Sequence, residues 1–490
     1  MNTANLSRRG LLQSSGGLIA LAALRSARGA EEPVSPVMAR LSAYMSEAAS
    51  RALPDDILEK TKHHILDTFA AMISGTQLGP GQLAIRFARA HSGEKVASVL
   101  GSDVVCGAIE AALANGMLAH SDETDDYAPV GTHPGSAVVP AALATGEQFG
   151  IDGMRFVRSI TLGYDIAGRV GAVLGGQLFN YEAHKAVHGF TGTFGAAAAG
   201  GCAASLDAQQ MRWLLDYASQ QASGLAAWQR DTEHIEKAFV FAGMPARNGV
   251  TAALLVQLGG TGVTDILSGA DNFLQAFAPK ADPAQLIEKL GQRYEVTTTN
   301  IKKWTVGGPI QAALDALEVL LKQRPIEPNQ VRQMIVRLGP VMGSVVNNRE
   351  MPDICVQHML AVMLLDKTAS FSAAHDKARM RDPAVLKQRA KIQLVFDPEI
   401  ERNTEQREAI VEVTLIDGTK LREHTTAVRG TAANPMTREE VVAKSRDLIT
   451  PVLGAPATAK LITKTLDLEN MKSVAELRPL LQLPPAAAQH

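Results

Sequence analysis

The sequence predicts a mainly α-helical protein in which a large, discontinuous all-helical domain is interrupted by a smaller inserted α/β lid domain. Three observations support this fold class. The chain has 41 Gly, only 4% aromatic residues and many Ala, Leu and Val, and such small side chains favour closely packed helices. Segments with strand-like composition begin only near residue 325. Helical patterning returns after residue 435 and lasts almost to the end of the chain.

The first part of the helical domain is expected over residues 36–299. Pro54, Asp55 and Asp56 have the chemistry of a helix start, because Pro fits the first turn and acidic side chains favour the helix dipole there. Apolar residues then keep helical spacing up to Gly75. Further Ala/Gly-rich stretches lack β-branched alternation and predict a helical bundle; they span 107–119, 137–149, 193–204 and 250–259.

The α/β lid domain is expected over residues 300–430. Strands are predicted at 331–338, 391–396 and 410–415, and the last of these leads into Asp417-Gly418, a strong hairpin signal. Thr437-Arg438-Glu439-Glu440 is a capping box that opens a helix through Leu448. The C-terminal part of the helical domain is therefore expected over residues 431–482, followed by a frayed tail, 483–490.

Residues 1–29 are predicted to be a twin-arginine signal peptide. The segment 7–13 places Arg8 and Arg9 before an apolar stretch, 11–24, that is too short for the roughly 20 residues of a membrane span. Small residues favour cleavage after Gly29, with Ala30 as the alternative. The competing interpretation is a soluble protein with a basic N-terminus. We expect a periplasmic protein that meets the twin-arginine export machinery and has no stable membrane anchor.

Charge and cysteine usage exclude other classes. Lys plus Arg is 48 and Asp plus Glu is 50, which leaves a net charge of −2 and no basic excess for binding nucleic acid. Cys106, Cys202 and Cys355 lie far apart without a C-x-x-C pair. We therefore expect buried thiols rather than a zinc knuckle or a disulfide framework.

The densest polar cluster runs from His120 to Tyr127 and continues at Thr132 and His133. It lies between two Ala-rich segments, so some of its acids should point inward, where an unpaired carboxylate costs several kcal/mol. A set of acid/base groups, a metal site and a solvated loop all fit this composition. Because neither HExxH nor EF-hand spacing accompanies the cluster, we expect no metal.

Two further groups attract attention. His184 and His188 are four residues apart, as on one helix face, but Gly189 and Gly192 indicate that His188 lies at a helix end or on a loop. The Gly-Thr-rich turn that follows could bind an anion at the start of the next helix. A third group is cationic, although each lysine taken alone is typical of the surface; it comprises Arg230, His234, Lys237, Arg247, Lys302 and Lys303.

Taken together, these groups resemble the MmgE/PrpD family, which includes 2-methylcitrate dehydratase, cis-aconitate decarboxylase and iminodisuccinate epimerase. The resemblance covers about residues 40–480. Its carriers are Ile65-Leu66-Asp67-Thr68, Asn115-Gly116, His120, Asp125-Asp126, His133-Pro134-Gly135, Gly163-Tyr164-Asp165, the segment 191–195, Lys237, the segment 243–249, Gln357 and the segment 363–366.

The resemblance implies cofactor-independent chemistry on a small carboxylic acid, in a cleft between the helical domain and the lid, by a homodimer. It implies that His133 is the acid/base residue, that Lys237 and Lys302 hold substrate carboxylates, and that Asp125 belongs to the catalytic set. The residues expected to contact substrate are Glu123, Asp126, Tyr127, His188, Thr191, Arg247 and His358. A base and cations at such a site suit proton removal beside a carboxylate.

Several positions depart from the family pattern. Glu123 stands where the decarboxylase and methylcitrate branches have Asp, and Tyr127 where they have Thr. His188 is shifted by one residue, Gly307-Gly308 replaces a Cys or His, and His358 replaces a pocket Tyr. We expect a lyase that dehydrates or hydrates a hydroxy acid. An epimerase or decarboxylase of the same family, a periplasmic carboxylate-binding protein without turnover and a metal hydrolase are the alternatives.

Overall fold

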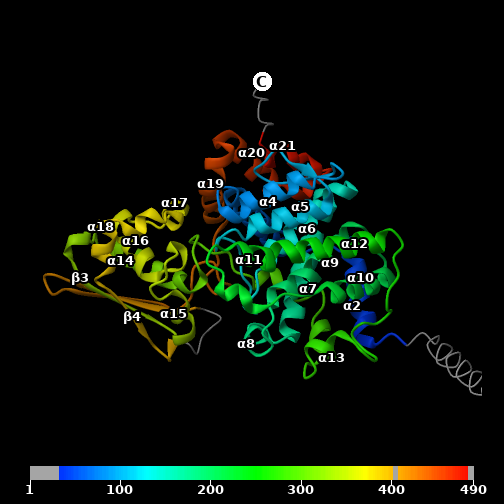
Figure 1. The fold of residues 1–490 in the computed structure, drawn as a ribbon, viewed down its shortest axis with the longest axis horizontal. Coiled ribbons are helices and arrows are strands. Elements are labelled where there is room, and N and C mark those ends of the chain that lie inside the picture. Colours follow the sequence, from blue (N-terminus) through cyan, green and yellow to red (C-terminus); the bar gives the residue numbers. More distant parts are fainter. Residues whose placement is uncertain (1–32, 401–406, 484–490) are drawn as a thin grey trace, which may run out of the picture.

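The computed structural model describes residues 33–400 and 407–483. Figure 1 shows a large helical body with a smaller α/β domain beside it. The predicted mainly helical fold with a smaller α/β part is confirmed. The predicted signal peptide, residues 1–29, lies outside the described residues, as does all of the predicted tail except Leu483.

The helical body forms where the Ala/Gly-rich stretches and the helix-start signals predict it. Its longer helices are α2 (Pro36–Glu47), α3 (Asp55–Gly75), α4 (Gly79–Ala90), α5 (Ala108–Ala119), α6 (Pro134–Phe149), α7 (Gly153–Val173), α9 (Val187–Ala203), α10 (Ala208–Gln221) and α12 (Met244–Gln257). Shorter pieces are α8 (Leu178–Glu182), α11 (Ile235–Ala238) and α13 (Phe273–Phe277), and β1 (Ala97–Ser98) pairs with β2 (Val105–Cys106). Three predicted landmarks, Pro54, Asp55 and Gly75, mark the ends of α3.

The Gly-Thr-rich segment is not a turn, contrary to the sequence-based prediction. Residues 187–203 form the continuous helix α9, and His184, with a φ of 55°, precedes it rather than sharing a face with His188. The glycines serve close packing instead. A Cβ on Gly189 would lie 2.2 Å from the Ser223 carbonyl oxygen, and one on Gly192 would lie 2.9 Å from Pro245. Packing therefore overrides the low helix propensity of glycine.

The α/β domain has a four-stranded sheet in the order β4-β3-β5-β6. Its strands are β3 (Val331–Leu338), β4 (Ile392–Phe396), β5 (Ala409–Leu415) and β6 (Lys420–Thr425). β3 runs parallel to β4 and antiparallel to β5, and β5 joins β6 through the predicted hairpin, where Gly418 has a φ of 87°. The helices of this domain are α14 (Gln311–Gln323), α15 (Pro340–Val346), α16 (Val356–Asp366), α17 (Phe371–His375) and α18 (Pro383–Arg389).

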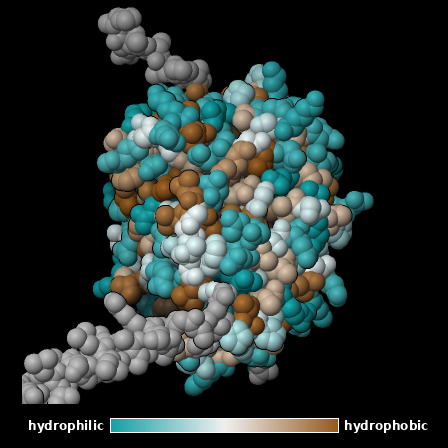
Figure 2. Space-filling view, turned by 90° about the vertical axis from the view of Figure 1, so that its right-hand side faces the viewer, coloured by the Kyte–Doolittle hydropathy of each residue, from teal (hydrophilic) through white to brown (hydrophobic). Residues whose placement is uncertain are grey.

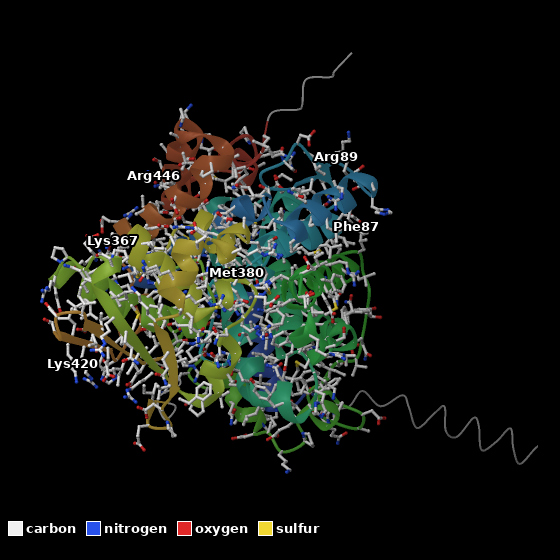
Figure 3. The ribbon with its side chains drawn as sticks, turned by 60° about the vertical axis from the view of Figure 1, so that its left-hand side comes forward. Phe87, Arg89, Lys367, Met380, Lys420 and Arg446 are labelled. Carbon is white, nitrogen blue, oxygen red and sulfur yellow. The ribbon has the colours of Figure 1, made fainter. Side chains whose placement is uncertain are left out.

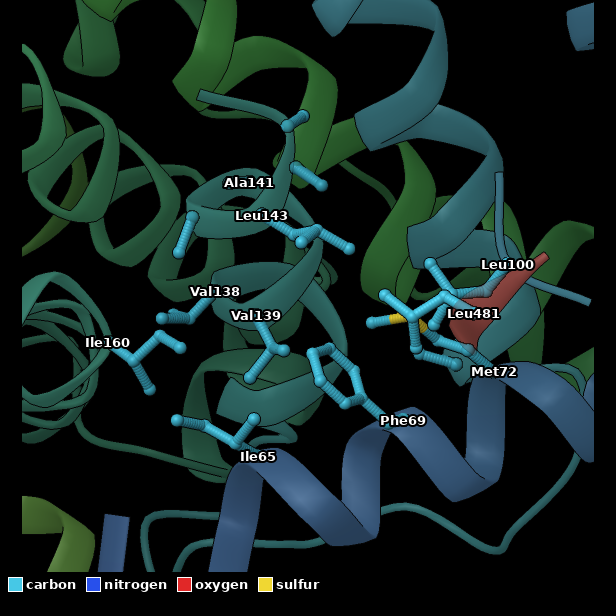
Figure 4. Packing of buried hydrophobic residues seen from close by; sticks show 14 of the residues in the cluster. Ile65, Phe69, Met72, Leu100, Val138, Val139, Ala141, Leu143, Ile160 and Leu481 are labelled. Carbon is cyan, nitrogen blue, oxygen red and sulfur yellow. The ribbon is translucent and has the colours of Figure 1, made fainter. Parts of the chain in front are cut away.

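The C-terminal helices return to the helical body. α19 (Arg438–Leu453) begins at Thr437 with the predicted capping box and ends five residues later than expected; α20 (Ala455–Leu466) and α21 (Arg478–Leu481) follow. Their apolar residues join the same hydrophobic core as α3, α5 and α6. Figure 4 shows Leu481 beside Leu100 and Met72 in this core. A second core lies between α2, α7, α9 and α10, and a third is made by residues from Trp304 to Val428.

Surface and burial agree with a packed globular protein. On the face shown in Figure 2, hydrophobic residues form small groups between hydrophilic ones, and Figure 3 shows Lys420 of the α/β domain and Arg89 of α4 on opposite sides of the molecule. The continuous helical stretch Ile235–Gln257 is apolar and long enough to cross a membrane, but most of it is buried inside the protein, as in a core helix. Cys106, Cys202 and Cys355 are free and buried, as predicted.

Candidate active site

The site is organised around the loop that joins α5 to α6. α5 ends at Ala119 and α6 begins with Pro134 at its first position, so the intervening loop carries the whole polar cluster. Asp126 anchors this loop. Its carboxylate accepts hydrogen bonds from the Tyr164 hydroxyl at 2.6 Å and the backbone N–H of Gly135 at 3.0 Å, and it lies 2.7 Å from Nδ1 of His64.

Asp125 holds two imidazole rings. Its Oδ2 lies 2.9 Å from Nδ1 of His120, and its Oδ1 lies 3.2 Å from Nδ1 of His133. Burial alone would raise the pKa of Asp125, but His120 and His133 outweigh it and place the pKa well below its usual value. Asp125 is therefore a fixed negative charge between the two rings.

His133 is poised to exchange a proton. Since a carboxylate only accepts hydrogen bonds, Nδ1 of His133 carries the hydrogen in the neutral ring, which leaves the lone pair on Nε2. Burial lowers the pKa of His133 below its usual value, although Asp125 opposes the shift. Near pH 7 the ring is consequently neutral, and its Nε2 can accept a proton.

Two lysines meet the carboxylate of Glu123. The ammonium of Lys237 contacts Oε1, and the ammonium of Lys302 lies 3.6 Å from Oε2 and donates to the Glu123 carbonyl oxygen at 2.7 Å. Burial would raise the pKa of Glu123, but the two cations hold it well below its usual value. Lys302 is almost fully buried, whereas the side chain of Lys237 keeps 16% exposure. Lys237 is thus the better placed of the two to reach a substrate.

Aromatic rings form a wall beside these charges. Phe241 lies in the single π-helical turn Phe239–Gly243 between α11 and α12, a local geometry that is frequent at functional sites. His188 stacks on Phe241 with ring centroids 3.5 Å apart, and Trp228 packs edge-on at 4.7 Å. Burial lowers the pKa of His188, and the nearby His133 adds to this effect, so its ring is neutral.

Buried nitrogen atoms point to a polar ligand. The wall includes His120, whose ring lies 4.8 Å from that of Phe241 and 5.2 Å from that of His234. Among the described residues, four buried ring nitrogens around Phe241 have no hydrogen-bond partner: His120 Nε2, His188 Nδ1, His234 Nε2 and Trp228 Nε1. Because an unsatisfied buried polar atom costs free energy, these atoms are suited to a ligand that offers hydrogen-bonding groups.

The same cluster contains a set of metal-ligand residues. The ligand atoms of His120, Asp125 and His133 lie within 4.8 Å of one another. However, the carboxylate of Asp125 already engages both Nδ1 atoms, and the ammonium of Lys302 lies 3.8 Å from its Oδ1. That ammonium would repel a divalent cation, so the geometry is better suited to proton transfer than to metal binding.

The structure brings together several of the residues singled out from the sequence. Asp125, His133, Glu123, Lys237 and Lys302 form one connected group, and His133 is linked to His188 by adjacent rings 5.5 Å apart.

Three other residues predicted to bind substrate, Arg247, Thr191 and His358, have contacts of their own. Arg247 donates to the side chain of its neighbour Asn248, and the hydroxyl of Thr191 donates to the Val187 carbonyl oxygen inside α9. His358 is buried in the α/β domain, where Arg389, Arg379 and Asp376 are its charged neighbours.

Asp126 and Tyr127 contact other parts of the protein. Asp126 is occupied by the anchoring contacts described above. The ring of Tyr127 lies 4.0 Å beneath the guanidinium of Arg407, at the edge of a cavity of about 500 Å³ between α7, α8 and α15.

Sequence reasoning did not assign a role to several residues that the fold brings to the site. They are His120, Asp122, Trp228, His234, Phe241, Asp353 and His375. His120 and Asp122 belong to the dense polar cluster, and His234 precedes Lys237, so their composition was a usable signal. Nothing local in the sequence connects Asp353 or His375 to this loop.

The chain matches known protein domains along most of its length. Residues 39–286 match the MmgE/PrpD N-terminal domain and residues 304–468 match the MmgE/PrpD C-terminal domain. The chain is 25% identical to human cis-aconitate decarboxylase over 459 residues, which cover 88% of this chain and 92% of that protein. It is also 25% identical to cis-aconitate decarboxylase of Aspergillus terreus over 489 residues, 92% of this chain and 96% of that protein.

A third relative, the cis-aconitate decarboxylase-like protein oryM of Aspergillus oryzae, is 27% identical over 313 residues, and the match spans 60% of this chain and 63% of that protein. The two domain matches follow one another along the chain and together include the loop from His120 to His133, Lys237 and the α/β domain. The chain therefore belongs to the MmgE/PrpD family.

Proposed function

We propose that the protein is a cofactor-independent lyase that acts on a small di- or tricarboxylic acid, with His133 transferring a proton at the carbon beside a carboxylate. The observation that carries this proposal is the neutral ring of His133, with Nδ1 held by Asp125 and Nε2 available. Lys237 is the partly exposed cation nearby, and it would bind a substrate carboxylate and stabilise the enolate-like charge that develops.

A neutral base favours dehydration of a hydroxy acid. Nε2 of His133 takes the proton bound to carbon, the electron pair of that C–H bond forms the double bond, and the hydroxyl leaves as water after receiving a proton. The proton held by His133 can be the one delivered, which balances the step. Hydration is the same sequence in reverse.

Decarboxylation is the second candidate, because full-length relatives carry the name cis-aconitate decarboxylase. In that reaction the bond to the departing carboxylate breaks, CO2 leaves, and the remaining electron pair receives a proton at carbon. His133 would then have to be protonated in the complex. A bound polycarboxylate supplies negative charge that favours the imidazolium form.

Incubation with cis-aconitate and a panel of hydroxy-dicarboxylates and hydroxy-tricarboxylates in deuterated buffer tests the proposal. We expect turnover of one substrate, and loss of water or of CO2 identifies the reaction. Carbon-bound deuterium should appear in the product of decarboxylation or hydration, and in recovered hydroxy acid when proton removal reverses. His133→Ala should lower turnover by about 10²–10⁴. Lys237→Ala should raise KM, and it should lower kcat as well if the contact strengthens in the transition state.

Lys303→Ala is the matched control, because Lys303 pairs with Glu318 outside the site. Melting temperatures measured beside the kinetics separate lost chemistry from lost folding. Folded His133 and Lys237 variants with normal turnover would reject the proposed site. Absence of water loss, of CO2 loss and of deuterium uptake with every acid would reject the reaction class.

We also propose export by the twin-arginine route and assembly as a homodimer. Support for export is the segment 7–13 with Arg8 and Arg9, and support for assembly is the family membership and the small residues of the helical body. Arg8→Lys with Arg9→Lys should keep the precursor in the cytoplasm at full length.

The proposed homodimer is tested by light scattering at micromolar concentration, which should give the mass of two chains. A monomer mass would reject the dimer.

A further inference from the structure

An ion pair joins helix α17 of the α/β domain directly to the active-site loop. Nε2 of His375, the last residue of α17, lies 2.9 Å from Oδ2 of Asp122. Both side chains are mostly buried, with 16% and 5% exposure. Asp122 immediately precedes Glu123, whose carboxylate meets Lys237 and Lys302.

The surroundings of His375 determine its charge. Nδ1 lies 2.7 Å from the carbonyl oxygen of Phe371, which can only accept, so Nδ1 carries a hydrogen. Nε2 faces the carboxylate of Asp122, also an acceptor. The contact at Nε2 lacks the geometry of a hydrogen bond, so it acts through charge: a carboxylate oxygen 2.9 Å away favours the imidazolium form of the ring.

The other packed elements agree with this charge state. Asp353, in the turn Pro352–Ile354, is the second carboxyl group that acts on His375, and the Phe371 ring packs 4.2 Å from the imidazole. Burial alone would lower the pKa of His375, but Asp122 and Asp353 raise it to about 9. Burial raises the pKa of Asp353 to about 6, and His375 limits that rise.

Asp122 converts this contact into a constraint on the loop. Its carboxylate also accepts from the backbone N–H of Thr124 at 2.9 Å and from the Thr124 hydroxyl at 2.6 Å. These bonds close a tight turn with Glu123 at its centre. Asp125 follows Thr124 in the sequence. The position of this turn therefore determines where the Asp125 carboxylate, which contacts Nδ1 of His133, lies.

We propose that His375 is a positioning residue supplied by the α/β domain, which fixes the turn of Asp122 and thereby aligns Glu123 and Asp125 when the two domains are in contact. This inference rests on the proposed function only for its kinetic consequence. The arrangement makes the catalytic loop complete only while α17 is seated against it.

A second ion pair across the same boundary provides a control. Lys377, two residues after His375, lies 3.8 Å from Glu233, but both side chains are about two-thirds exposed. Exposed pairs of this kind contribute little. If simple attachment of the α/β domain were all that mattered, loss of either pair should have a comparable effect.

The test compares His375→Gln, His375→Arg and Asp122→Asn with Lys377→Gln in the full chain. We expect His375→Gln and Asp122→Asn to lower kcat about 10–100-fold with KM changed less than threefold, and the double variant to be no worse than either single one. His375→Arg should recover part of the activity because it restores the cation. Lys377→Gln should behave like the unaltered chain.

Two readouts do not depend on turnover. Hydrogen exchange in a peptide covering residues 120–127 should be faster in His375→Gln and Asp122→Asn than in Lys377→Gln. In histidine-labelled protein, NMR should show the His375 ring charged at pH 8, and neutral at that pH in Asp122→Asn. If His375→Gln does not fold, Asp122→Asn carries the same comparison.

Unchanged exchange and a neutral His375 ring at pH 8 would overturn the inference. Normal kcat in a folded His375→Gln variant would also overturn it. Failure of the unaltered chain to turn over any carboxylic acid would instead reject the proposed function, while the exchange and NMR results would still decide the role of His375.

Discussion

A single carboxylate, that of Asp125, sets the tautomers of two imidazole rings. Both His120 and His133 present Nδ1 to it, so each neutral ring keeps its lone pair on Nε2. The two rings lie 4.8 Å apart, and only the His133 side chain retains exposure, at 12%. His133 is therefore the ring that can meet a substrate, and His120 helps to hold the carboxylate that orients it.

This arrangement makes Asp125→Asn a sharp test of the pH dependence. If neutral His133 is the base, kcat/KM in the unaltered chain should fall as the pH drops through a value below 6.5, because burial lowers the pKa of His133. Asp125 opposes that shift, so its replacement by Asn should move the acid limb to still lower pH. The amide can also favour the wrong tautomer, so kcat should fall by about 10²–10⁴.

A pH–rate profile from pH 4.5 to 8 measures both effects. Asp152→Asn is the control: Asp152 caps α7 on the surface, and Asn caps helices equally well, so activity should not change. An acid limb that stays in place or moves to higher pH in Asp125→Asn would contradict the assignment of His133 as the base.

Single residues also show where sequence-based prediction reached its limit. Glu123, Asp125 and His133 could be singled out because charged groups between buried segments need partners, and the structure joins them. Arg247 lies in a family motif and His358 stands in the place of a family Tyr; the side chain of Arg247 donates to Asn248, and His358 is buried among residues of the α/β domain. The direction of a side chain depends on the tertiary packing of its helix, which a motif does not specify.

At the scale of secondary-structure elements, glycine determines how closely the central helices approach. α9 and α12 pack so tightly that a Cβ on Gly249 would lie 2.4 Å from the backbone nitrogen of Ala197. The same crossing places the π-helical turn before α12, and with it Phe241, against His188 of α9. The spacing of the two helices and the shape of the aromatic wall are therefore set together.

Gly249→Ala should destabilise the protein by about 1–3 kcal/mol, because the atoms in the way belong largely to the backbone and the helices must separate. Gly79→Ala is the matched control. Gly79 begins α4, and a Cβ there would meet nothing within 4 Å. Urea unfolding of both variants measures the difference. Equal stability of the two would mean that the α9–α12 crossing adjusts freely.

Elements with local signals were predicted well, and those that depend on packing were not. The β5–β6 hairpin follows from Asp417-Gly418, and the start of α19 follows from its capping box, since both signals lie within a few residues. The Gly-Thr segment was predicted as a turn because glycine disfavours helix by about 0.5–1 kcal/mol relative to alanine. Close packing of α9 with its neighbours overrides that local preference.

At the scale of the whole molecule, the active-site loop is held from several directions. Lys444 of the C-terminal helix α19 lies 2.7 Å from Oδ1 of Asp67 and donates to the Thr124 carbonyl oxygen at 3.0 Å. From the other side, the α/β domain reaches Asp122 through His375. No local pattern predicts such contacts, because they join parts of the chain that are hundreds of residues apart in sequence.

The contact of His375 with Asp122 also predicts how stability depends on pH. The pKa of His375 rises from about 6.5 in the unfolded chain to about 9 in the folded protein. A raised folded-state pKa gives stabilisation that is fully present below pH 6.5 and is lost as the pH rises through about 9. Its upper limit is about 3 kcal/mol, from 1.36 kcal/mol for each pKa unit.

His375→Gln removes this stabilisation, so the free energy of unfolding of the unaltered chain should exceed that of the variant most at pH 6. The part of this difference that depends on pH should shrink steadily between pH 6.5 and 9 and be lost near pH 10. Urea unfolding at each pH measures this difference in the free energy of unfolding. For Lys377→Gln, the difference from the unaltered chain should not change with pH over this range, because the ion pair of Lys377 with Glu233 is exposed. A difference between the unaltered chain and His375→Gln that stays constant over this range would show that the ring carries no charge in the folded protein. Asp122 would then be held by Thr124 without the charge of His375, and the contacts of Lys302 with Glu123 and of Arg407 with Tyr127 would be the charged contacts that remain between residues 300–430 and the loop.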